Sequence, residues 1–274
     1  MTVIDAKKLN KLWAKSTDLN NPLRDRHMYD LAFFLWSNRQ FDEAVGVTGA
    51  LIDLLSERVG SSLWIDTMHL RSLTLHDAKR DEEAIETELK ALEYGETLAP
   101  ANERAFMHWH LADCYRTTDQ QELQEAEYLK AIDAFIEGEN KWHLGQAYLD
   151  LANLHYLARR YQESKKWFQL AIPVLQETQR TDRMPFVKYR LAGVERYSEN
   201  FKGALPCAEE ALTLSKYVSD VTAERENLIE LAQVHVGLNN FEIAVNILDS
   251  LINDNDDQVK NRSAAKAMYY KAKT

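Results

Sequence analysis

Residues that interrupt helices are scarce in this sequence. Glycine occurs 9 times and proline 5 times in 274 residues. Because both residues mark turns and breaks, their scarcity favours long helices over short strands joined by many turns. The chain length fits one large domain or two smaller ones, so length alone leaves the domain count open.

Cysteine is scarcer still, since Cys114 and Cys207 are the only two in the chain. Neither belongs to a CxxC motif, which disfavours both a disulfide framework and a zinc ribbon. We expect two reduced, mostly buried thiols of the kind found in cytosolic proteins.

Long apolar runs are absent. No stretch approaches the roughly 20 apolar residues that a helix needs to cross a bilayer. The N-terminal segment MTVIDAKKLNKLWAK lacks the apolar core of a signal peptide. We therefore expect a cytoplasmic protein with no membrane partner.

Positive charge is in deficit. Lysine and arginine total 33 against 43 aspartates and glutamates, which gives a net charge of -10. An acidic chain repels phosphate backbones, so a nucleic-acid partner is disfavoured, including RNA bound by stacked helical repeats. The acidic run Glu82, Glu83, Glu86 and Glu88 is expected to form a solvated outer face, with a docking strip for a basic partner as the alternative.

Motifs of catalysis are missing. The sequence has no Gly-rich phosphate loop, no HExxH and no GxSxG, so we expect no enzyme, no cofactor and no metal. His108 and His110 stand two positions apart, and helical neighbours at that spacing point away from each other. His155 and His235 occupy equivalent positions, where we expect buried structural histidines.

The sequence does contain a repeat of 40 residues, present six times without insertion. Its template is the stretch from Leu151 to Ile172, LANLHYLARRYQESKKWFQLAI, which reads as helix, turn, helix. A leucine and a small residue open the pattern at Leu31-Ala32, Leu111-Ala112, Leu151-Ala152, Leu191-Ala192 and Leu231-Ala232, with Arg71-Ser72 in the second unit. Next come Phe41, Asp81, Gln121, Tyr161, Phe201 and Phe241, then Ala44, Ala84, Gln124, Ser164, Ala204 and Ala244, and finally Leu51, Ala91, Ala131, Ala171, Ala211 and Leu251.

This pattern has a direct physical meaning. Small residues let two antiparallel helices approach closely, and the aromatic at the start of the second helix fills the gap between neighbouring units. One such hairpin cannot bury its apolar face alone, so successive copies stack into a solenoid.

The leucine and small residue, the aromatic at the Tyr161 position and the two small residues after it resemble the tetratricopeptide repeat family. The resemblance covers residues 25 to 254. The common form of that family repeats every 34 residues, so each helix here would be about three residues longer, or roughly 5 Å. The long form is similar to kinesin light chains, spindle-orientation adaptors and bacterial intracellular peptide-pheromone receptors. HEAT-like repeats have a similar length and are the second choice.

Several residues depart from the pattern. Arg71 replaces the leucine, Asp81 and Gln121 replace the aromatic, and Gln124 replaces a small residue. Glu195 stands where a large packing residue is usual. Each departure is either a local looseness of packing or a change that faces a partner, and the sequence alone leaves both readings open.

The predicted fold is all-α, a right-handed superhelical solenoid of about six antiparallel helix pairs with short capping helices, forming a single domain over residues 1–274. The N-terminal cap is predicted within residues 1–20, as a helix over 4–16, and the C-terminal cap over 258–272. The pairs are predicted at 25–38 and 41–56, 62–78 and 81–97, 102–117 and 121–137, 141–158 and 161–177, 183–198 and 201–217, and 221–237 and 241–253. Pro173 should kink its helix near Gln169, whereas Pro185 and Pro206 are expected in first turns, where proline is tolerated.

The resemblance implies that the first helix of each pair lines a concave groove. The candidate groove residues combine aromatic rings with a few polar groups, which suits a protein or peptide ligand, although any single ring is as readily a packing residue between first helices. They are Tyr29, Phe33, Trp36, His69, His76, Phe106, Trp109, Asp113, Arg116, Asn153, Tyr156, Phe186, Tyr189, Arg196 and Gln233, with Asp66, Asp77 and Tyr197 beside them.

Two ligand modes of the family can be compared with these positions. Some members bind C-terminal carboxylates with lysine and asparagine, but the equivalent positions here, Tyr29, His69, Trp109, Leu149 and Tyr189, hold no lysine. In the pheromone receptors a groove asparagine holds the ligand backbone, and Asn153 falls at a matching position. An asparagine bound to solvent or to the core is the alternative.

These observations predict a non-catalytic scaffold or adaptor that holds a polypeptide in an aromatic groove. One alternative is a self-associating structural or regulatory subunit, a homodimer through the end helices that carry Trp13 and Tyr269-Tyr270. Another is a peptide-sensing regulator that lacks the DNA-binding domain of the pheromone receptors. The partner itself is not encoded in any recognisable motif.

Overall fold

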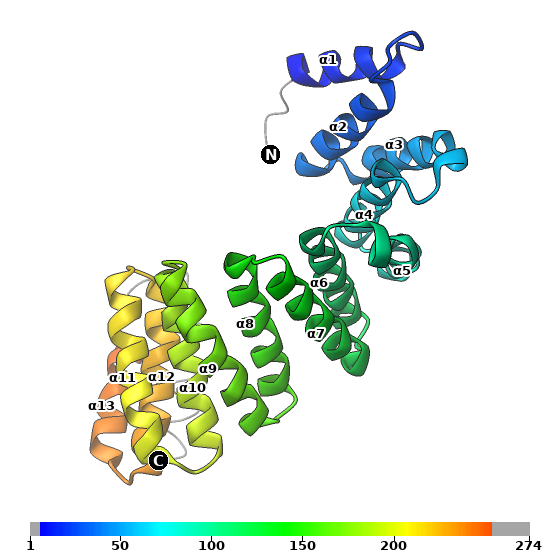
Figure 1. The fold of residues 1–274 in the computed structure, drawn as a ribbon. Helices are drawn as coiled ribbons and strands as arrows, with labels where there is room; N and C mark the ends of the chain where they lie inside the picture. Colours follow the sequence, from blue (N-terminus) through cyan, green and yellow to red (C-terminus); the bar gives the residue numbers. More distant parts are fainter. Residues whose placement is uncertain (1–5, 254–274) are drawn as a thin grey trace. The chain divides into compact units, whose positions relative to one another are not determined.

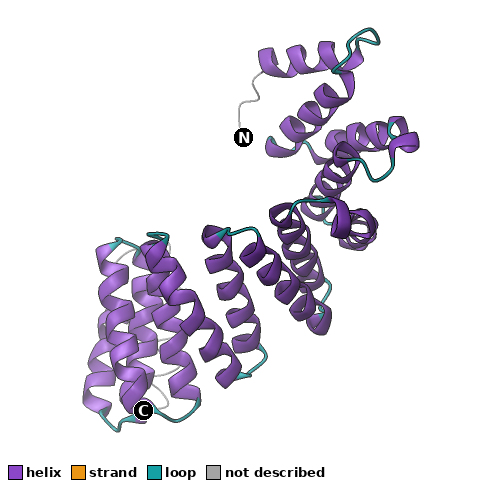
Figure 2. Ribbon diagram, in the orientation of Figure 1, coloured by secondary structure: helices purple, strands orange, loops and turns teal. Residues whose placement is uncertain are grey.

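The structure is a computed structural model that describes residues 6–253. Over those residues the chain is built of helices and short turns, without a strand (Figures 1 and 2). The helices are α1 (Ala6–Thr17), α2 (Arg24–Ser37), α3 (Phe41–Leu54), α4 (Ser62–Asp77), α5 (Asp81–Leu98), α6 (Ala101–Thr117), α7 (Gln121–Glu137), α8 (Lys141–Leu157), α9 (Tyr161–Glu177), α10 (Met184–Tyr197), α11 (Phe201–Tyr217), α12 (Val221–Gly237) and α13 (Phe241–Asn253). Two short 3-10 helices, η1 (Ser56–Arg58) and η2 (Thr181–Arg183), lie in connections between pairs.

The helices form two compact units, one over residues 1–140 and the other over 141–274. In each unit, helices that follow one another in the sequence pack together. The six predicted pairs are present, from α2 with α3 to α12 with α13, and α1 precedes them as the predicted N-terminal helix. The predicted closing helix over 258–272 lies outside the described residues, and the hand of the superhelix stays a prediction.

The turns repeat as faithfully as the helices. After nine of the described helices, the residue that follows the C-cap adopts a left-handed conformation, with φ between 53° and 66°, and none of these nine residues is glycine. They are Arg39, Lys79, Asp119, Glu139, Arg159, Gln179, Glu199, Ser219 and Asn239. At Arg159, for example, its N–H donates to the carbonyl of Tyr156 at 3.1 Å and the next N–H donates to His155 at 2.8 Å, the Schellman arrangement that satisfies the last carbonyls of a helix.

The small residues of the repeat lie where the two helices of a pair meet. All eleven are buried, from Ala32 and Ala44 in the first pair to Ala232 and Ala244 in the sixth, and so is Gln124 at the twelfth position. Where serine replaces alanine, its hydroxyl donates across the contact: Ser72 to the carbonyl of Ala84 at 2.7 Å, and Ser164 to that of Ala152 at 2.9 Å. The close approach of the helices thus holds without an unsatisfied hydroxyl.

The aromatic that begins the second helix reaches the following pair in unit 2, as predicted. Tyr161 stacks on Tyr197, with ring centroids 5.0 Å apart. One repeat later Phe201 meets Gly237, the residue equivalent to Tyr197, so closely that a Cβ on the glycine would lie 2.1 Å from the ring. The space between neighbouring pairs is thus filled by two stacked rings in one repeat, and by a ring packed against a glycine at the equivalent position of the next.

Two departures from the repeat are explained by polar contacts. The guanidinium of Arg71 reaches α3, where it donates to the carbonyl of Val45 at 2.7 Å. Glu195 sits in place of a packing residue and binds the ammonium of Lys165 at 2.5 Å. Both are substitutions that the fold absorbs locally.

One proline prediction is wrong. Pro206 is not in the first turn of its helix, because α11 begins at Phe201 and Pro206 lies inside it. Pro185 does lie in the first turn of α10. Pro173 is inside α9, which continues to Glu177, and the predicted kink at Gln169 stays a prediction.

Candidate functional site

All fifteen candidate groove residues lie on the first helices of their pairs, α2, α4 and α6 in unit 1 and α8, α10 and α12 in unit 2. Helical spacing places them on these elements, because side chains three or four residues apart share a face. The structure brings them together in clusters within each unit. Whether they bind a ligand stays a proposal.

In unit 1 the candidate aromatic residues rest on one another. The rings of Phe33 and Trp36 lie 5.4 Å apart, and the indole N–H of Trp36 donates to Asp77 at 2.7 Å. Further along, Phe106 and Trp109 both pack on Phe135, at 5.3 and 6.1 Å between centroids. Phe135 is fully buried, so Phe106 and Trp109 serve partly as core residues.

A small pocket of about 240 Å³ in unit 1 joins three of the candidates, Tyr29, His69 and Phe106. Asp66 and Glu103 also line it. Burial raises the pKa of both carboxyls, and the charge of Asp66 raises the pKa of Glu103 further. Burial also raises the pKa of Tyr29, and the charges of both carboxylates add to that rise. Arg26 and His69 also line the pocket, which therefore combines two carboxyls and two basic groups with aromatic walls.

His69 has an internal partner that the sequence did not indicate. Its Nδ1 lies 2.7 Å from Oε1 of Glu88, whose side chain is fully buried. Burial by itself would lower the pKa of His69, but the charge and hydrogen bond of Glu88 outweigh it and raise the pKa. The prediction of a solvated face at Glu88 is therefore wrong, whereas Glu82, Glu83 and Glu86 are exposed as expected.

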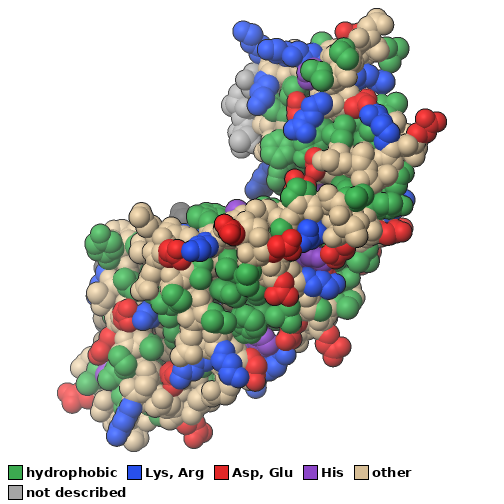
Figure 3. All heavy atoms as spheres, viewed as in Figure 1, with side chains coloured by type: hydrophobic (Ala, Val, Ile, Leu, Met, Phe, Trp, Pro, Cys, Tyr) green, Lys and Arg blue, Asp and Glu red, His purple; other side chains and the backbone are tan. Residues whose placement is uncertain are grey.

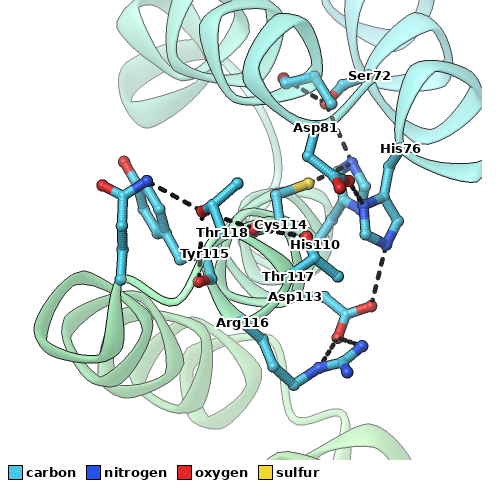
Figure 4. A network of polar contacts seen from close by, with 12 residues as sticks. Ser72, His76, Asp81, His110, Asp113, Cys114, Tyr115, Arg116, Thr117 and Thr118 are labelled. Atoms are coloured by element: carbon cyan, nitrogen blue, oxygen red, sulfur yellow. Dashed lines mark hydrogen bonds and ion pairs between the residues drawn. The ribbon is translucent and has the colours of Figure 1, made fainter. Parts of the chain in front are cut away.

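His76 connects two carboxylates, as Figure 4 shows. Its Nδ1 lies 2.5 Å from Asp81, and its Nε2 lies 3.4 Å from Asp113, which also binds the guanidinium of Arg116. The hydrogen bond of Asp113 does most to raise the pKa of His76. Asp81, which replaces the aromatic of the repeat, is thus part of a polar network. The candidates His76, Asp113 and Arg116 satisfy one another.

His110 lies beside that network and is buried (Figure 4). Its Nε2 is 3.0 Å from Oγ of Ser72 and 3.6 Å from Sγ of Cys114. The hydroxyl of Ser72 donates to the carbonyl of Ala84, so its oxygen accepts a hydrogen bond from His110. His110 is therefore the neutral tautomer that carries its proton on Nε2. Burial lowers the pKa of His110 to about 4. His108 turns elsewhere, to Glu127 at 2.6 Å, and no group of three or more metal-ligating residues occurs in the part of the chain that is described.

The thiols and the remaining histidines behave largely as predicted. Cys114 and Cys207 are free thiols, the first buried and the second partly exposed. Burial raises the pKa of both, which suppresses thiolate chemistry. His155 and His235 are buried.

In unit 2 the candidate Tyr156 is the centre of an aromatic cluster. Its ring lies 5.9 Å from Tyr161 and 6.1 Å from Tyr197. Its hydroxyl points at α10, where a Cβ on Gly193 would lie only 2.5 Å away. Burial raises the pKa of Tyr156 to about 12, so its hydroxyl stays protonated.

Arg196, another candidate, is fully engaged. Its guanidinium binds buried Glu230 with two nitrogens, at 2.6 and 3.1 Å, and lies 4.2 Å from the ring of Tyr197. Although burial would lower the pKa of Arg196, the hydrogen bond and charge of Glu230 raise it. This pair fixes α10 against α12.

Arg190 was missed by sequence reasoning. Its guanidinium carbon lies 4.6 Å from the ring centre of Tyr156, 5.1 Å from Phe186 and 5.6 Å from Tyr189. Three predicted residues therefore surround a fourth that the prediction omitted. The available signal was an arginine one and four residues after two rings on the same helix.

The side-chain oxygen of Asn153 is buried and accepts no hydrogen bond from any described residue. Phe186 and Tyr189 line a pocket of about 340 Å³ between α10 and α12, beside Glu226 and Asn227. Gln233 lines a second pocket, of about 410 Å³, with Arg196 and Tyr197. Unit 2 thus carries concave, ring-lined surface beside polar groups.

Charged side chains are dispersed on the face shown in Figure 3, where Lys and Arg intermingle with Asp and Glu. No basic stripe follows the helices on that face. The helices of the described chain are too short or too polar for any of them to span a bilayer.

No family model and no curated protein matches the sequence. Solved structures do match. A signal transduction ATPase with numerous domains from Pyrococcus horikoshii, which has a tetratricopeptide repeat sensor, is 15% identical with a TM-score of 0.74 over 97% of this chain and 39% of that chain. Nearly identical kinesin-light-chain TPR-like repeats from Podosopora anserina are 15% identical with a TM-score of 0.61 over 73% and 99%. A Rap protein complexed with competence and sporulation factor is 16% identical with a TM-score of 0.51 over 93% and 66%.

The paired helices and the 40-residue register define a helical-repeat protein. Its fold is the tetratricopeptide-like one of these structures. The likeness at 15–16% identity concerns the fold alone.

Proposed function

We propose that the protein is a non-catalytic scaffold that binds a polypeptide on the first helices of its repeats. The observation that carries this proposal is the cluster of Tyr156, Phe186 and Tyr189 around Arg190 in unit 2. Large rings supply contact area at a small cost in side-chain entropy, and a central arginine beside rings is the composition of binding hot spots.

Two further facts support the proposal. Phe186 and Tyr189 line a pocket of about 340 Å³, and Arg196 and Tyr197 line another of about 410 Å³. Both pockets are suited to side chains of an extended peptide. A Rap protein of similar fold has been solved in complex with competence and sporulation factor, so this architecture can hold such a ligand.

A catalytic role receives no support from the histidines of the described chain. His69 is bound to Glu88, His76 to Asp81 and Asp113, and His110 to Ser72. These contacts stabilise helix packing, and none places a nucleophile beside a base in an open cleft.

The test is affinity capture from native lysate with the full chain as bait, followed by mass spectrometry. The double variant Tyr156→Ala/Tyr189→Ala should lose the captured partner. Tyr217→Ala is the matched control, because its ring is 87% exposed on the second helix α11, and it should capture normally. Equal capture by all three proteins, with circular dichroism showing them folded, would remove the first helices of unit 2 as the binding surface.

Self-association is a second candidate with its own observation. A mostly apolar groove of about 800 Å³ runs between α1, α2 and α3, and Trp13 on its edge is 56% exposed. Sedimentation over a wide concentration range should then show a dimer that Trp13→Ala dissociates. A monomer at every concentration would exclude this candidate. Tyr269 and Tyr270 lie outside the described residues.

A further inference from the structure

The environment of Arg190 is unusual for an arginine in this fold. Its guanidinium lies among the rings of Tyr156, Phe186 and Tyr189, and its Nε is buried without an acceptor in the described chain. By contrast, Arg196 and Arg116 on equivalent helices hold carboxylates, those of Glu230 and Asp113. Arg190 is an always-charged group with no anion supplied by the described residues.

Such an arrangement has an energetic cost. A buried donor without an acceptor forfeits the free energy of a hydrogen bond to water, and a partly buried charge loses solvation as well. The ring faces compensate part of this cost through cation–π attraction. They cannot accept the in-plane N–H bonds of the guanidinium, which match a carboxylate with two parallel hydrogen bonds.

A second unsatisfied group lies on α8, the helix that carries Tyr156. Asn153 lies three residues before Tyr156, on the same side of α8, and Tyr156 is the residue that contacts Arg190. The buried oxygen of Asn153 lacks a donor. Gly193 allows the Tyr156 hydroxyl to approach α10, which sets the ring that supports the guanidinium. Arg190 is therefore held against a ring that Gly193 helps to position, and no described residue supplies it with an anion.

We infer that Arg190, supported by Tyr156, Phe186 and Tyr189, forms a subsite for a carboxylate of a bound peptide. The carboxylate comes from an acidic side chain or from a free C-terminus. This inference rests on the proposed peptide-binding function of unit 2 and names the chemistry that the function requires.

The test uses the full-length chain and three pools of fluorescein-labelled seven-residue peptides in fluorescence anisotropy. The first pool has a fixed central aspartate and an amidated C-terminus. The second has asparagine there and the same amide, and the third has asparagine with a free C-terminus. Binding of the first or third pool about tenfold or more tighter than the second is expected, and the tighter of the two identifies the source of the carboxylate.

Variants locate the effect. Arg190→Gln should abolish the preference for the carboxylate pools, so that the variant binds all three pools with equal affinity. Arg190→Lys keeps the positive charge but cannot form two parallel hydrogen bonds with a carboxylate. This variant should therefore retain a reduced preference for the carboxylate pools. Arg159→Gln, an exposed turn residue of the same unit, is the control and should behave as the unmodified protein.

The two ideas fail in different ways. Equal binding of all three pools, or a carboxylate preference that survives Arg190→Gln, overturns the subsite while peptide binding stands. If none of the three pools binds, the subsite is overturned and the result counts against the proposed function. If Arg190→Gln does not fold, the comparison of pools on the unmodified protein and on Arg190→Lys decides.

Discussion

At the scale of single residues, the turns reveal a cost that the scarcity of glycine imposes. Nine non-glycine residues adopt left-handed φ values, and each L residue in that conformation is strained by about 1 kcal/mol. Glycine is the usual occupant of this position after a helix. The chain therefore carries turn strain that a single substitution can relieve.

Lys79, with φ at 66°, is suited to such a test. Lys79→Gly should stabilise unit 1 by up to about 1 kcal/mol, because glycine accepts the left-handed conformation freely. Ala78→Gly is the matched control, since Ala78 has φ at -78° and the added backbone freedom should destabilise by about 0.5–1 kcal/mol. Urea denaturation measures both. If Lys79→Gly instead lowered the free energy of unfolding, Lys79 would not be strained in its left-handed conformation.

Protonation of His110 should control acid stability. Its pKa is about 4 in the folded protein and about 6.5 when unfolded, so the unfolded chain binds more protons between these values. The contribution of neutral His110 to stability is complete above pH 6.5 and is lost as the pH falls towards 4. Urea midpoints of His110→Gln should depend less on pH in that window than those of the unmodified protein.

His76 has the opposite sign and serves as the internal comparison. Its pKa is raised, so its contribution is complete below pH 6.5 and is lost as the pH rises through the raised value. His76→Gln should therefore flatten the alkaline side of the stability profile. An unchanged slope on both sides would mean that Asp81 and Asp113 do not hold a charged imidazole.

At the scale of elements, much of the fold follows from the sequence. Leu151, Ala152 and Ser164 recur every 40 residues, and their spacing fixed which residues meet between helices. The structure confirms the helix pairs and the buried small positions. Pro206 was misplaced although the helix start at 201 was predicted correctly, because the sixth residue of α11 lies beyond the first turn.

The candidate site was less predictable than the fold. Helical spacing identified the face that carries Tyr156 and Tyr189, but Arg190 was missed because its importance depends on a ring from another helix. Glu88 was predicted on a solvated acidic face because it follows other glutamates in the sequence. In the structure its partner is His69 on α4, 19 residues earlier. Partners far apart in sequence leave no periodic trace, so only coordinates reveal them.

Glycines at helix contacts provide a matched pair of tests. Gly237→Ala should destabilise unit 2 by about 1–3 kcal/mol, because the new Cβ would lie 2.1 Å from the ring of Phe201. Gly46→Ala meets no atom within 4 Å and should stabilise unit 1 by about 0.5–1 kcal/mol, since alanine is the better helix former. Thermal unfolding measures both, and equal effects would argue against the ring contact.

At the scale of the whole molecule, each helix packs mainly on its neighbours in sequence. Stability in such a chain is close to a sum of repeat and nearest-neighbour terms. A destabilising substitution in one repeat should therefore affect mainly that repeat and its neighbours. Different parts of the chain can unfold locally with different free energies.

Hydrogen exchange measured by mass spectrometry tests this expectation. Gly237→Ala weakens the contact between α11 and α12, so amides of α10 to α13 should exchange faster in the variant. Amides of α2 to α5 in unit 1 should keep the exchange rates of the unmodified protein, because no helix there touches the altered residue. Gly46→Ala is the reciprocal control and should slow exchange in α3 only. Faster exchange spread evenly over both units would instead mean that all the repeats unfold as one cooperative body.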